Sequence, residues 1–403
     1  MAAKVLILGG GFAGLSAVAT LAAHGRRGEV RIECLDRRAE STFLPLLPDL
    51  ISGRLRGEHL LFPIAPFCAA RGAIFRQAEV RTIDLQRPAA VVADGLVTAD
   101  YVILAIGCDT ATFGRADLAG QSMTLKSAPD GPAIAQRLRL LTADLMDGRV
   151  AASAPAVVVV GGGYTGLEAA SHAAWLLRRL RKLSPERLKE PLPVLVVEKG
   201  DVPLSNASPA TRAWTLRAIS GYGVEVRTRC TVEAIEGRTV RLTDGDRLSP
   251  AVVIWAPGVA PGPAAADLPR AASRGRRVQV NTALSVAGAE RVFAAGDIAA
   301  ATPPGHSQPL RMGVQFSLRA GRSAAMNVLR HIRGRPMMTF DPLDPGYLLP
   351  LSPTKASGRV LGAELRGRLP AGLHYFMSVL RSWSWSNRIG IMKDLGQAMR
   401  EEP

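Results

Sequence analysis

The sequence predicts an α/β protein with two Rossmann-like dinucleotide-binding domains and a smaller C-terminal α+β region. Two observations support this fold class. An apolar strand that leads into G-x-G-x-x-G and then into a helical run occurs at residues 5–14 and again at residues 157–166. Each copy is followed by an apolar strand that ends in an acid, Asp36 in the first and Glu198 in the second. Two such units on one chain predict two nucleotide cofactors that exchange electrons or hydride.

The first copy has the residues that a pyrophosphate cradle needs. Its first two glycines let the backbone turn and approach a phosphate, and its third lets the helix pack on the strand, while the helix N-terminus supplies amide groups and a positive dipole. Asp36 suits a ribose diol, and its neighbour Arg37 is a further candidate contact. Glycine-rich turns also occur without ligands, so one copy alone would be weak evidence. The loop candidates are Gly9, Gly11, Phe12, Ala13 and Gly14.

The second copy repeats this arrangement and indicates which nucleotide it prefers. A carboxylate at Glu198 welcomes a free ribose 2′-hydroxyl and repels a 2′-phosphate, which favours NADH, although the adjacent Lys199 weakens the exclusion of NADPH. Glu168 is the sole charge in the apolar first turns of the following helix. It is either a functional group or a solvated acid favoured by the helix dipole. The loop candidates are Gly161, Gly163, Tyr164, Thr165 and Gly166.

Strands, glycines and prolines indicate the domain boundaries. Residues 1–125 are the first part of the first nucleotide domain, 126–285 the second nucleotide domain, 286–335 a return to the first, and 336–403 the C-terminal region. The N-terminal apolar run could pass for a signal peptide. Because its glycines fall at the dinucleotide spacing, we expect it to stay in the mature protein. No transmembrane helix is expected.

The composition is that of a globular enzyme with an excess of positive charge. The 403 residues are 47% hydrophobic and 21% charged, and the formal net charge is +16. Arginines and lysines greatly outnumber acids in residues 311–335 and 366–400, which favours an anionic membrane surface or a nucleic acid. The sequence lacks RNA-binding signatures with interleaved aromatic residues, so we favour the membrane surface over a nucleic acid as the partner of these basic regions. The four cysteines and six histidines show no metal-ligand spacing, and we predict no metal site.

Apolar residues recur at helical spacing near the C-terminus and predict an amphipathic tail. A helix that carries tryptophans and basic residues suits a bilayer interface. The alternative is a helix that packs on the domain core or on a partner in a homodimer. The apolar series is Leu373, Phe376, Met377, Leu380 and Trp383, with Trp385, Ile389 and Met392 beyond it.

Together these motifs resemble type II NADH dehydrogenase, or NADH:quinone oxidoreductase, within the FAD-dependent pyridine nucleotide-disulfide oxidoreductase superfamily. The resemblance covers essentially the full length. It rests on the first loop with Asp36, on the second loop with Glu168, and on residues 42–47, 104–107 and 295–297. Within 104–107, Ile106 departs from the usual A-T-G. It implies hydride transfer from NADH to FAD and electron transfer on to a membrane quinone, without proton pumping. It also implies a peripheral enzyme on the cytoplasmic face of the inner (plasma) membrane.

The resemblance further assigns residues to the cofactors. Gly296 and Asp297 would lie by the ribityl or phosphate part of FAD, unless Asp297 only caps a turn. The segment around Pro45 would lie by the flavin, or is a hydrophobic core loop. A helix suggested over 312–329 would aim its positive N-terminus at the flavin, and Glu168 would sit near nicotinamide and flavin. Further cofactor-binding candidates are Ala105, Gly107 and Gly258.

Cysteine motifs that the chain lacks reduce the number of possible electron acceptors. Glutathione- and lipoamide-type reductases need C-x-x-x-x-C after the first acid and thioredoxin reductases need C-x-x-C in the second domain, and neither motif occurs. Sulfide:quinone oxidoreductases use a late cysteine, but the last one here is Cys230. Quinone therefore fits best. The family's quinone motif is A-Q-x-A-x-Q-x-G. Here Gln315 matches its first glutamine, and Arg319 replaces the second. Both are candidate catalytic residues together with Glu168; the alternative is that Gln315 and Arg319 simply share a helix face.

Other functions stay open at this point. A soluble NAD(P)H-dependent flavoprotein reductase would serve another acceptor, such as an electron-transfer protein or oxygen. A sulfide:quinone-type relative would lack the thiol relay. A redox-sensing flavoprotein that binds nucleic acid through its basic surface is less favoured.

Overall fold

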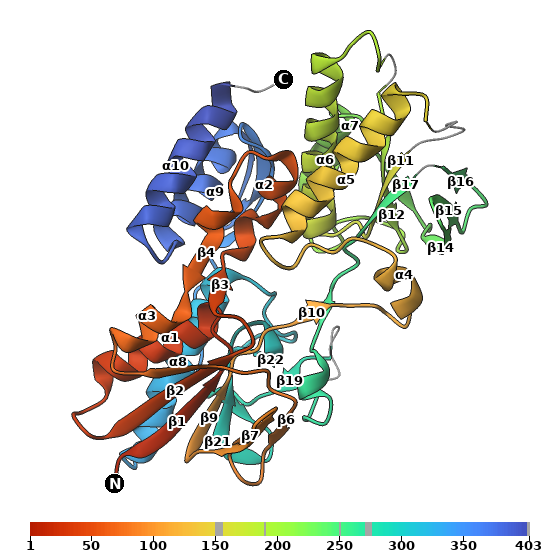
Figure 1. Cartoon of the computed structure of the whole chain (residues 1–403). Coiled ribbons are helices and arrows are strands. Elements are labelled where there is room, and N and C mark those ends of the chain that lie inside the picture. Colours follow the sequence, from red (N-terminus) through yellow and green to blue (C-terminus); the bar gives the residue numbers. More distant parts are fainter. Residues whose placement is uncertain (150–155, 189–190, 250, 271–275, 401–403) are drawn as a thin grey trace. The chain divides into compact units, whose positions relative to one another are not determined.

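The computed structural model describes the chain except for residues 150–155, 189–190, 250, 271–275 and 401–403 (Figure 1). The described chain forms two compact units. The first unit contains Met1–Thr42, Phe62–Asp109 and Val259–Leu343, and the second contains Phe43–Leu61, Thr110–Gly258 and Asp344–Pro403. The four-segment division derived from the sequence stays a prediction.

A six-stranded sheet is the centre of the first unit. Its order is β20-β21-β9-β1-β2-β5, and all neighbours are parallel except the antiparallel pair β20 and β21. The apolar runs of β1 and β9 are buried, as expected for central strands of a parallel sheet. The strands are β1 (Ala3–Leu8), β2 (Val30–Asp36), β5 (Ile74–Gln77), β9 (Tyr101–Leu104), β20 (Ser285–Val286) and β21 (Ala289–Ala294).

Two helices cover one face of this sheet, and a small antiparallel sheet packs on the other. α1 (Phe12–His24) and α8 (Val314–Ile332) lie side by side (Figure 1). Gly321 allows the two helices to approach closely, because a Cβ at this position would lie 2.0 Å from the carbonyl oxygen of Ala13. On the other face, Leu6, Leu8 and Val102 join a core with β6 (Thr82–Asp84), β7 (Ala89–Val92) and β8 (Gly95–Thr98). The remaining elements of this unit are α3 (Ile64–Ala69), β19 (Val278–Gln279), β22 (Ala299–Ala300), η3 (Pro263–Ala265), η4 (Gly296–Ile298) and β3 (Glu40–Thr42).

The second unit contains the second predicted parallel sheet. Its order is β13-β12-β11-β17, and the central strand β11 is buried along its whole length. The strands are β11 (Ala156–Val160), β12 (Val194–Glu198), β13 (Val224–Thr228) and β17 (Ala251–Trp255), with an antiparallel sheet of β14 (Val232–Glu236), β15 (Thr239–Leu242) and β16 (Arg247–Leu248). The helices are α4 (Ala116–Gly120), α5 (Asp130–Met146), α6 (Tyr164–Leu183) and α7 (Pro209–Ser220). The predicted fold class is confirmed.

The C-terminal region joins the second unit. It consists of an antiparallel sheet, β23 (Gly346–Ser352), β24 (Lys355–Val360) and β25 (Ala363–Gly367), followed by α9 (Arg368–Arg381) and α10 (Trp385–Arg400). Three short elements from early in the chain, η1 (Leu44–Leu46), α2 (Leu47–Ser52) and η2 (Gly57–Leu60), belong to the same unit. At the boundaries of the two units lie the short strands β4 (Leu61–Pro63), β10 (Asp109–Thr110) and β18 (Val259–Ala260).

The amphipathic tail is two helices, where the sequence pattern predicts a single one. Ser382 leaves the helical conformation, with ψ of 136°, and the hydroxyl of Ser384 accepts the N–H of Asn387 and so caps the start of α10. These local bonds of serine compete with the helix. Within the described residues, no helix is both long enough and apolar enough to span a membrane.

Within the second unit, one face of α10 packs on the segment that contains Arg56 and His59. The carboxylate of Asp394, only 6% exposed, accepts the N–H of Arg56 at 3.0 Å and lies 2.6 Å from Nδ1 of His59. Gly390 allows this approach, because a Cβ there would lie 2.3 Å from the His59 ring. The opposite face of the helix, with Trp385 and Ile389, stays exposed.

Candidate functional site

The first glycine loop has the geometry of a phosphate cradle. Gly9 has a φ of +108°, and a Cβ there would lie 2.3 Å from the carbonyl oxygen of Ala105. A Cβ at Gly14 would lie 1.8 Å from the carbonyl oxygen of Gly9, so this glycine allows α1 to pack on the end of β1. By contrast, the Cβ position at Gly11 meets no described atom within 4 Å. This open side of the loop is where a ligand can approach the backbone.

The N-terminus of α1 is available to an anion. Gly11 is its N-cap residue, so no side chain caps it, and its first turn, Phe12–Gly14 onward, contains no acid. The first N–H groups of a helix have no partner within the helix and carry its positive dipole. The predicted loop residues therefore lie together at an anion-binding helix terminus.

Asp36 lies at the end of β2, next to this loop. Its Oδ2 accepts the N–H of Gly10 at 2.7 Å, and its Oδ1 accepts the N–H of Arg38 at 2.8 Å. Each carboxylate oxygen can accept a second hydrogen bond, so both remain able to bind a ribose hydroxyl. The guanidinium of Arg37 is exposed and pairs with Asp109 at 3.1 Å.

The second loop reproduces the first almost bond for bond. Gly161 has a φ of +109°, and its Cβ would lie 2.4 Å from the carbonyl oxygen of Ala256. The Cβ of an alanine at Gly166 would lie 1.9 Å from the carbonyl oxygen of Gly161, while that at Gly163 meets no described atom within 4 Å. Gly163 is also the N-cap of α6, which begins at Tyr164.

Glu198 holds the same position in the second unit as Asp36 in the first. Its Oε2 accepts the N–H of Gly162 at 2.7 Å, and its Oε1 accepts the N–H of Gly200 at 2.7 Å. Among the other candidates of this unit, Thr165 is exposed, the ring of Tyr164 meets that of Tyr347 edge to face at 5.2 Å, and Gly258 has a φ of +138°.

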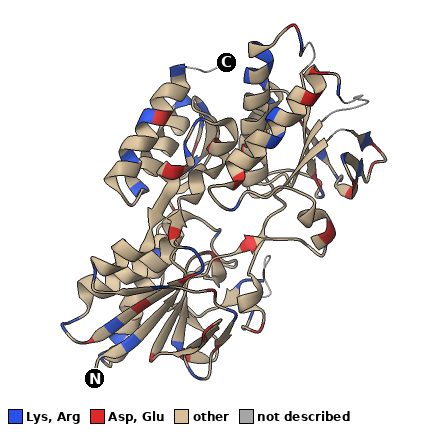
Figure 2. Cartoon of the chain, viewed as in Figure 1, with Lys and Arg blue, Asp and Glu red and all other residues tan. Residues whose placement is uncertain are grey.

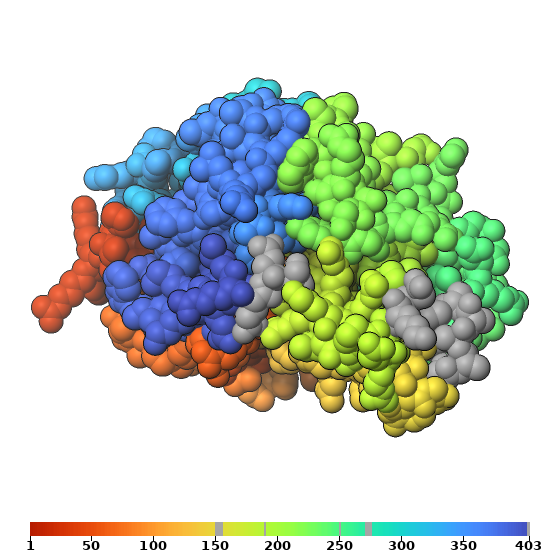
Figure 3. All heavy atoms as spheres, turned by 90° about the horizontal axis from the view of Figure 1, so that it is seen from above, coloured from red at the N-terminus to blue at the C-terminus, as the bar shows by residue number. Residues whose placement is uncertain are grey.

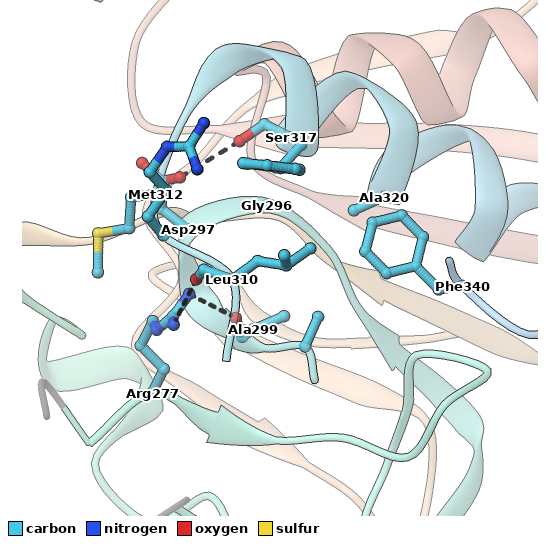
Figure 4. Close-up of a pocket in the computed structure, with 12 residues that line it drawn as sticks. Arg277, Gly296, Asp297, Ala299, Leu310, Met312, Ser317, Ala320 and Phe340 are labelled. Atoms are coloured by element: carbon cyan, nitrogen blue, oxygen red, sulfur yellow. Dashed lines mark hydrogen bonds between the residues drawn. The ribbon is translucent and has the colours of Figure 1, made fainter. Parts of the chain in front are cut away.

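Asp297 lines a small pocket of the first unit together with Ser317 and Ala320 of α8 (Figure 4). Ser317 in α8 donates its hydroxyl to Oδ1 of Asp297 at 3.3 Å. Gly296 has a φ of +78°, and a Cβ there would lie 3.0 Å from that of Ala13, so the glycine brings the acid close to the first loop. Gly107 also has a positive φ, +67°, but its Cβ position meets no described atom within 4 Å.

The structure adds a buried cation to this pocket that the sequence motifs do not indicate. Arg277 is only 7% exposed and donates to the carbonyl oxygens of Ala299 at 2.9 Å and Leu310 at 2.8 Å (Figure 4). Burial lowers the pKa of Arg277, while the nearby Cys108 and Asp297 act in the opposite direction. No motif surrounds this residue in the sequence, so only the fold reveals it.

Gln315 and Arg319 lie one turn apart on α8, as predicted, but in different surroundings. Gln315 is partly buried in the first turn, and its amide would be 3.3 Å from a Cβ at Gly313. Arg319 is exposed and donates to the carbonyl oxygen of Leu343 at 2.7 Å. Pro45 is partly exposed in η1 of the second unit.

Glu168 lies on the first turns of α6. Part of its surface reaches solvent, but most of it is enclosed by protein. This burial, with the repulsion of the Asp49 carboxylate, raises the pKa of Glu168 well above its usual value. A pKa shifted in this way is a property expected of a functional acid.

All four cysteines are buried, and none forms a disulfide. The fold brings Cys34 and Cys68, far apart in sequence, within hydrogen-bonding reach in the first unit. Neither lies in a C-x-x-C or C-x-x-x-x-C motif. The structure therefore offers no thiol pair of the kind that the disulfide reductases use.

Two Rossmann units, each with a glycine loop at a helix N-terminus and a strand-end carboxylate, define an oxidoreductase of the two-dinucleotide class. Residues 3–324 match the model of the pyridine nucleotide-disulphide oxidoreductase family, and the chain belongs to this family. The resemblance derived from the sequence is thus confirmed, together with the enzyme class and the flavin and nicotinamide cofactor pair.

Relatives match the chain over nearly its full length. It is 26% identical to demethylphylloquinone reductase NdbB of Synechocystis, with 99% of this chain and 98% of the relative covered. It is 23% identical to type II NADH:quinone oxidoreductase of Staphylococcus saprophyticus, over 91% and 92%. The fold is also that of NDH2 from Plasmodium falciparum in complex with NADH, with a TM-score of 0.86, 16% identity, and 100% and 99% coverage.

Proposed function

We propose that this chain is an FAD-dependent NADH:quinone oxidoreductase, non-electrogenic and peripheral to a membrane. The observation that carries the proposal is the doubled loop, in which Gly11 and Gly163 each leave open space at a helix N-terminus and Asp36 and Glu198 each stand beside it. The names of the full-length relatives support quinone as the acceptor.

The first unit fits FAD. A Cβ at Gly11 would fill the space that a pyrophosphate needs, and Asp36 presents two oxygens to a ribose. Asp297 would bind the ribityl or phosphate part from the pocket below α8. When bound, FAD would supply the two-electron chemistry between nicotinamide and quinone. The N-terminus of α8 would favour negative charge on the reduced flavin.

The second unit fits NADH. Gly161, Gly163 and Gly166 would hold the pyrophosphate, and Glu198 would accept a hydrogen bond from the ribose 2′-hydroxyl. The carboxylate is held in place by Gly162 and Gly200, so it cannot easily turn away from a 2′-phosphate. This fixed position supports a preference for NADH over NADPH.

The C-terminal helices support attachment to an anionic membrane surface. Figure 2 shows Lys and Arg along α9 and α10 among few acids, and Figure 3 shows α10 (dark blue) at the surface of the molecule. Apolar side chains beside basic ones suit the bilayer interface, where a lipid-soluble quinone would enter. The alternative is that these helices form the contact of a homodimer. We place the enzyme on the cytoplasmic face of the membrane. The exposed apolar side chains are Leu369, Phe376, Leu380, Trp385, Ile389, Met392 and Met399.

An anaerobic experiment tests the proposal. NADH should bleach the bound flavin, and a short-chain quinone should then reoxidise it. If NADH does not bleach the flavin, the enzyme class itself is refuted. If bleaching occurs without reoxidation by quinone, a reductase for another acceptor is favoured, as the substitution of Arg319 for the second motif glutamine would suggest.

A further inference from the structure

The second unit contains a buried polar cluster where α2, α6 and α9 meet. We call Asp49, Ser52, His172 and Tyr375 the Asp49 cluster. Asp49 is 1% exposed and His172 is fully buried. Tyr375 donates its hydroxyl to Oδ1 of Asp49 at 2.9 Å, and Nε2 of His172 lies 3.8 Å from the same oxygen. On the other side of the ring, Ser52 Oγ lies 3.0 Å from Nδ1 of His172.

Two polar atoms of this cluster lack hydrogen-bond partners among the described residues. They are Oδ2 of Asp49 and Nε2 of His172, and both are buried. An ionised carboxylate with one buried, unpaired oxygen is costly, and protonation reduces that cost. Burial therefore raises the pKa of Asp49 to about 6, although Arg54 and the hydroxyl of Tyr375 act in the opposite direction.

The other charged or titratable groups around Asp49 come from all three helices and the segment after α2. Arg54, 4% exposed, stacks on the ring of Trp175 at 4.4 Å. Burial and the Arg54 charge lower the pKa of His172 well below its usual value, so the ring is neutral. Burial and Arg381 lower the pKa of His374 to about 4, and burial raises the pKa of Tyr375. Asp49 is thus the member of the Asp49 cluster that changes charge near pH 6.

The Asp49 cluster reaches Glu168 along α6. Glu168 and His172 are four residues apart, which places them one above the other on one helix face. The repulsion between Asp49 and Glu168 also couples the two carboxyl groups electrostatically. Tyr375, Asp49, His172 and Glu168 therefore form one series of polar side chains, which ends two residues beyond the second glycine loop.

We propose that Asp49, positioned by Tyr375 and lying beside His172, stores the proton that quinone reduction consumes and resupplies it to Glu168. This inference rests on the proposed function. NADH, one proton and a quinone give NAD⁺ and a quinol, so both electrons and one hydrogen come from NADH and the second proton comes from water. In our scheme Glu168 donates its proton to the unprotonated oxygen of the reduced quinone, the Asp49 O–H bond then breaks as its proton passes to the Glu168 carboxylate, and a proton from the solvent returns to Asp49.

The test compares two acceptors in the FAD-loaded enzyme with and without Asp49→Asn. Menadione takes up protons when it is reduced, whereas ferricyanide takes up electrons alone. With Asp49→Asn we expect menadione turnover to fall at least about ten-fold. A group that transfers the proton directly contributes roughly a hundred-fold or more, and Asp49 acts only through Glu168. Flavin bleaching by NADH and ferricyanide turnover should stay within about two-fold of the wild type, because neither uses this proton.

A second variant separates proton storage from structural support. Wild-type menadione turnover should fall as the pH rises through about 6, because Asp49 then loses its proton. Tyr375→Phe removes a hydrogen bond that favours the carboxylate, so this fall should move to higher pH, while Asp49→Asn should abolish it. A merely structural role would not move the profile.

The outcomes distinguish the inference from the function on which it rests. If the wild-type enzyme does not reduce menadione, the proposed function fails and the inference fails with it. If it does, an unchanged menadione-to-ferricyanide ratio in Asp49→Asn overturns the inference alone. Should Asp49→Asn not bind FAD, a pH profile in Tyr375→Phe identical to that of the wild type also overturns it.

Discussion

The two nucleotide loops have the same geometry, but the helices that follow them contact different surroundings. In both, a Cβ on the third glycine would lie less than 2 Å from the carbonyl oxygen of the first, at 1.8 Å for Gly14 and 1.9 Å for Gly166. In both, the strand-end acid accepts the N–H of the loop's second residue at 2.7 Å. The short α1 then packs on α8, whereas the longer α6 leads from its loop into the Asp49 cluster.

This difference indicates that nucleotide binding and redox chemistry depend on different parts of each unit. The loop and its acid form a local device that binds a nucleotide wherever a strand, a turn and a helix follow one another. What the nucleotide can then do depends on side chains from distant segments. The pocket of the first unit offers Asp297 and Arg277. In the second unit, our proposals give such roles to Glu168 and Asp49.

The largest expected effect comes from filling the third glycine of either loop. Gly14→Ala and Gly166→Ala each force a methyl group onto a carbonyl oxygen of the backbone, and such overpacking costs about 1–3 kcal/mol or more. We expect Gly14→Ala to be purified without FAD. Gly166→Ala should keep its FAD but no longer be bleached by NADH. Flavin absorbance and thermal unfolding measure both effects.

The middle glycines are the matched controls for this pair. Gly11→Ala and Gly163→Ala add a methyl group where no described atom lies within 4 Å, so both variants should unfold at nearly the wild-type temperature. Each should still weaken its own nucleotide, because the methyl group enters the space of the pyrophosphate. If all four variants behave alike, the two loops do not divide the cofactors as proposed.

The strand-end acids should differ in what their loss changes. Glu198→Gln removes the charge that favours a free 2′-hydroxyl, and we expect kcat/KM for NADH to fall about ten- to a hundred-fold, as hydrogen bonds to charged groups contribute about 1.5–3 kcal/mol. The preference for NADH over NADPH should fall with it. Asp36→Asn should weaken FAD retention and leave that preference unchanged. Steady-state kinetics with both nucleotides would falsify the assignment if Asp36→Asn changes the preference.

Two buried or half-buried acids should give the two units opposite responses to pH. Asp49 has a raised pKa, so between about pH 4 and 6 the folded state keeps a proton that the unfolded chain releases, and the unfolding free energy falls as pH rises. Two pKa units correspond to at most about 3 kcal/mol. Arg333 lowers the pKa of Glu29 to about 2, so this pair stabilises the first unit above about pH 4.5 and the gain is lost as pH falls toward 2.

Unfolding measured across pH 2–7 checks both signs. Asp49→Asn should remove the loss of stability on raising the pH from 4 to 6, and Glu29→Gln should remove the loss on lowering it from 4.5 to 2. Two slopes of the same sign would contradict the comparison.

The sequence predicted what is local and missed what is long-range. Gly9, Gly14 and Asp36 could be found because the loop, the helix and the acid follow one another within a short stretch whose steric needs are known. The Asp49 cluster could not be found, because Tyr375 lies more than 300 residues from Asp49 and only the fold joins them. The tail was predicted as one helix, since apolar spacing does not reveal that Ser384 caps a second one.

The smallest expected effect concerns Arg319, where the sequence departs from the family's quinone motif. Its guanidinium is exposed and donates to the carbonyl oxygen of Leu343, so Arg319→Gln loses one surface hydrogen bond of about 1 kcal/mol or less. We expect KM for menadione to change no more than about five-fold, by the corresponding ratio of binding constants. Gln315→Ala, which alters a partly buried group in the first turn of α8, should raise it further. A larger effect at Arg319 than at Gln315 would mean that the arginine itself contacts the quinone.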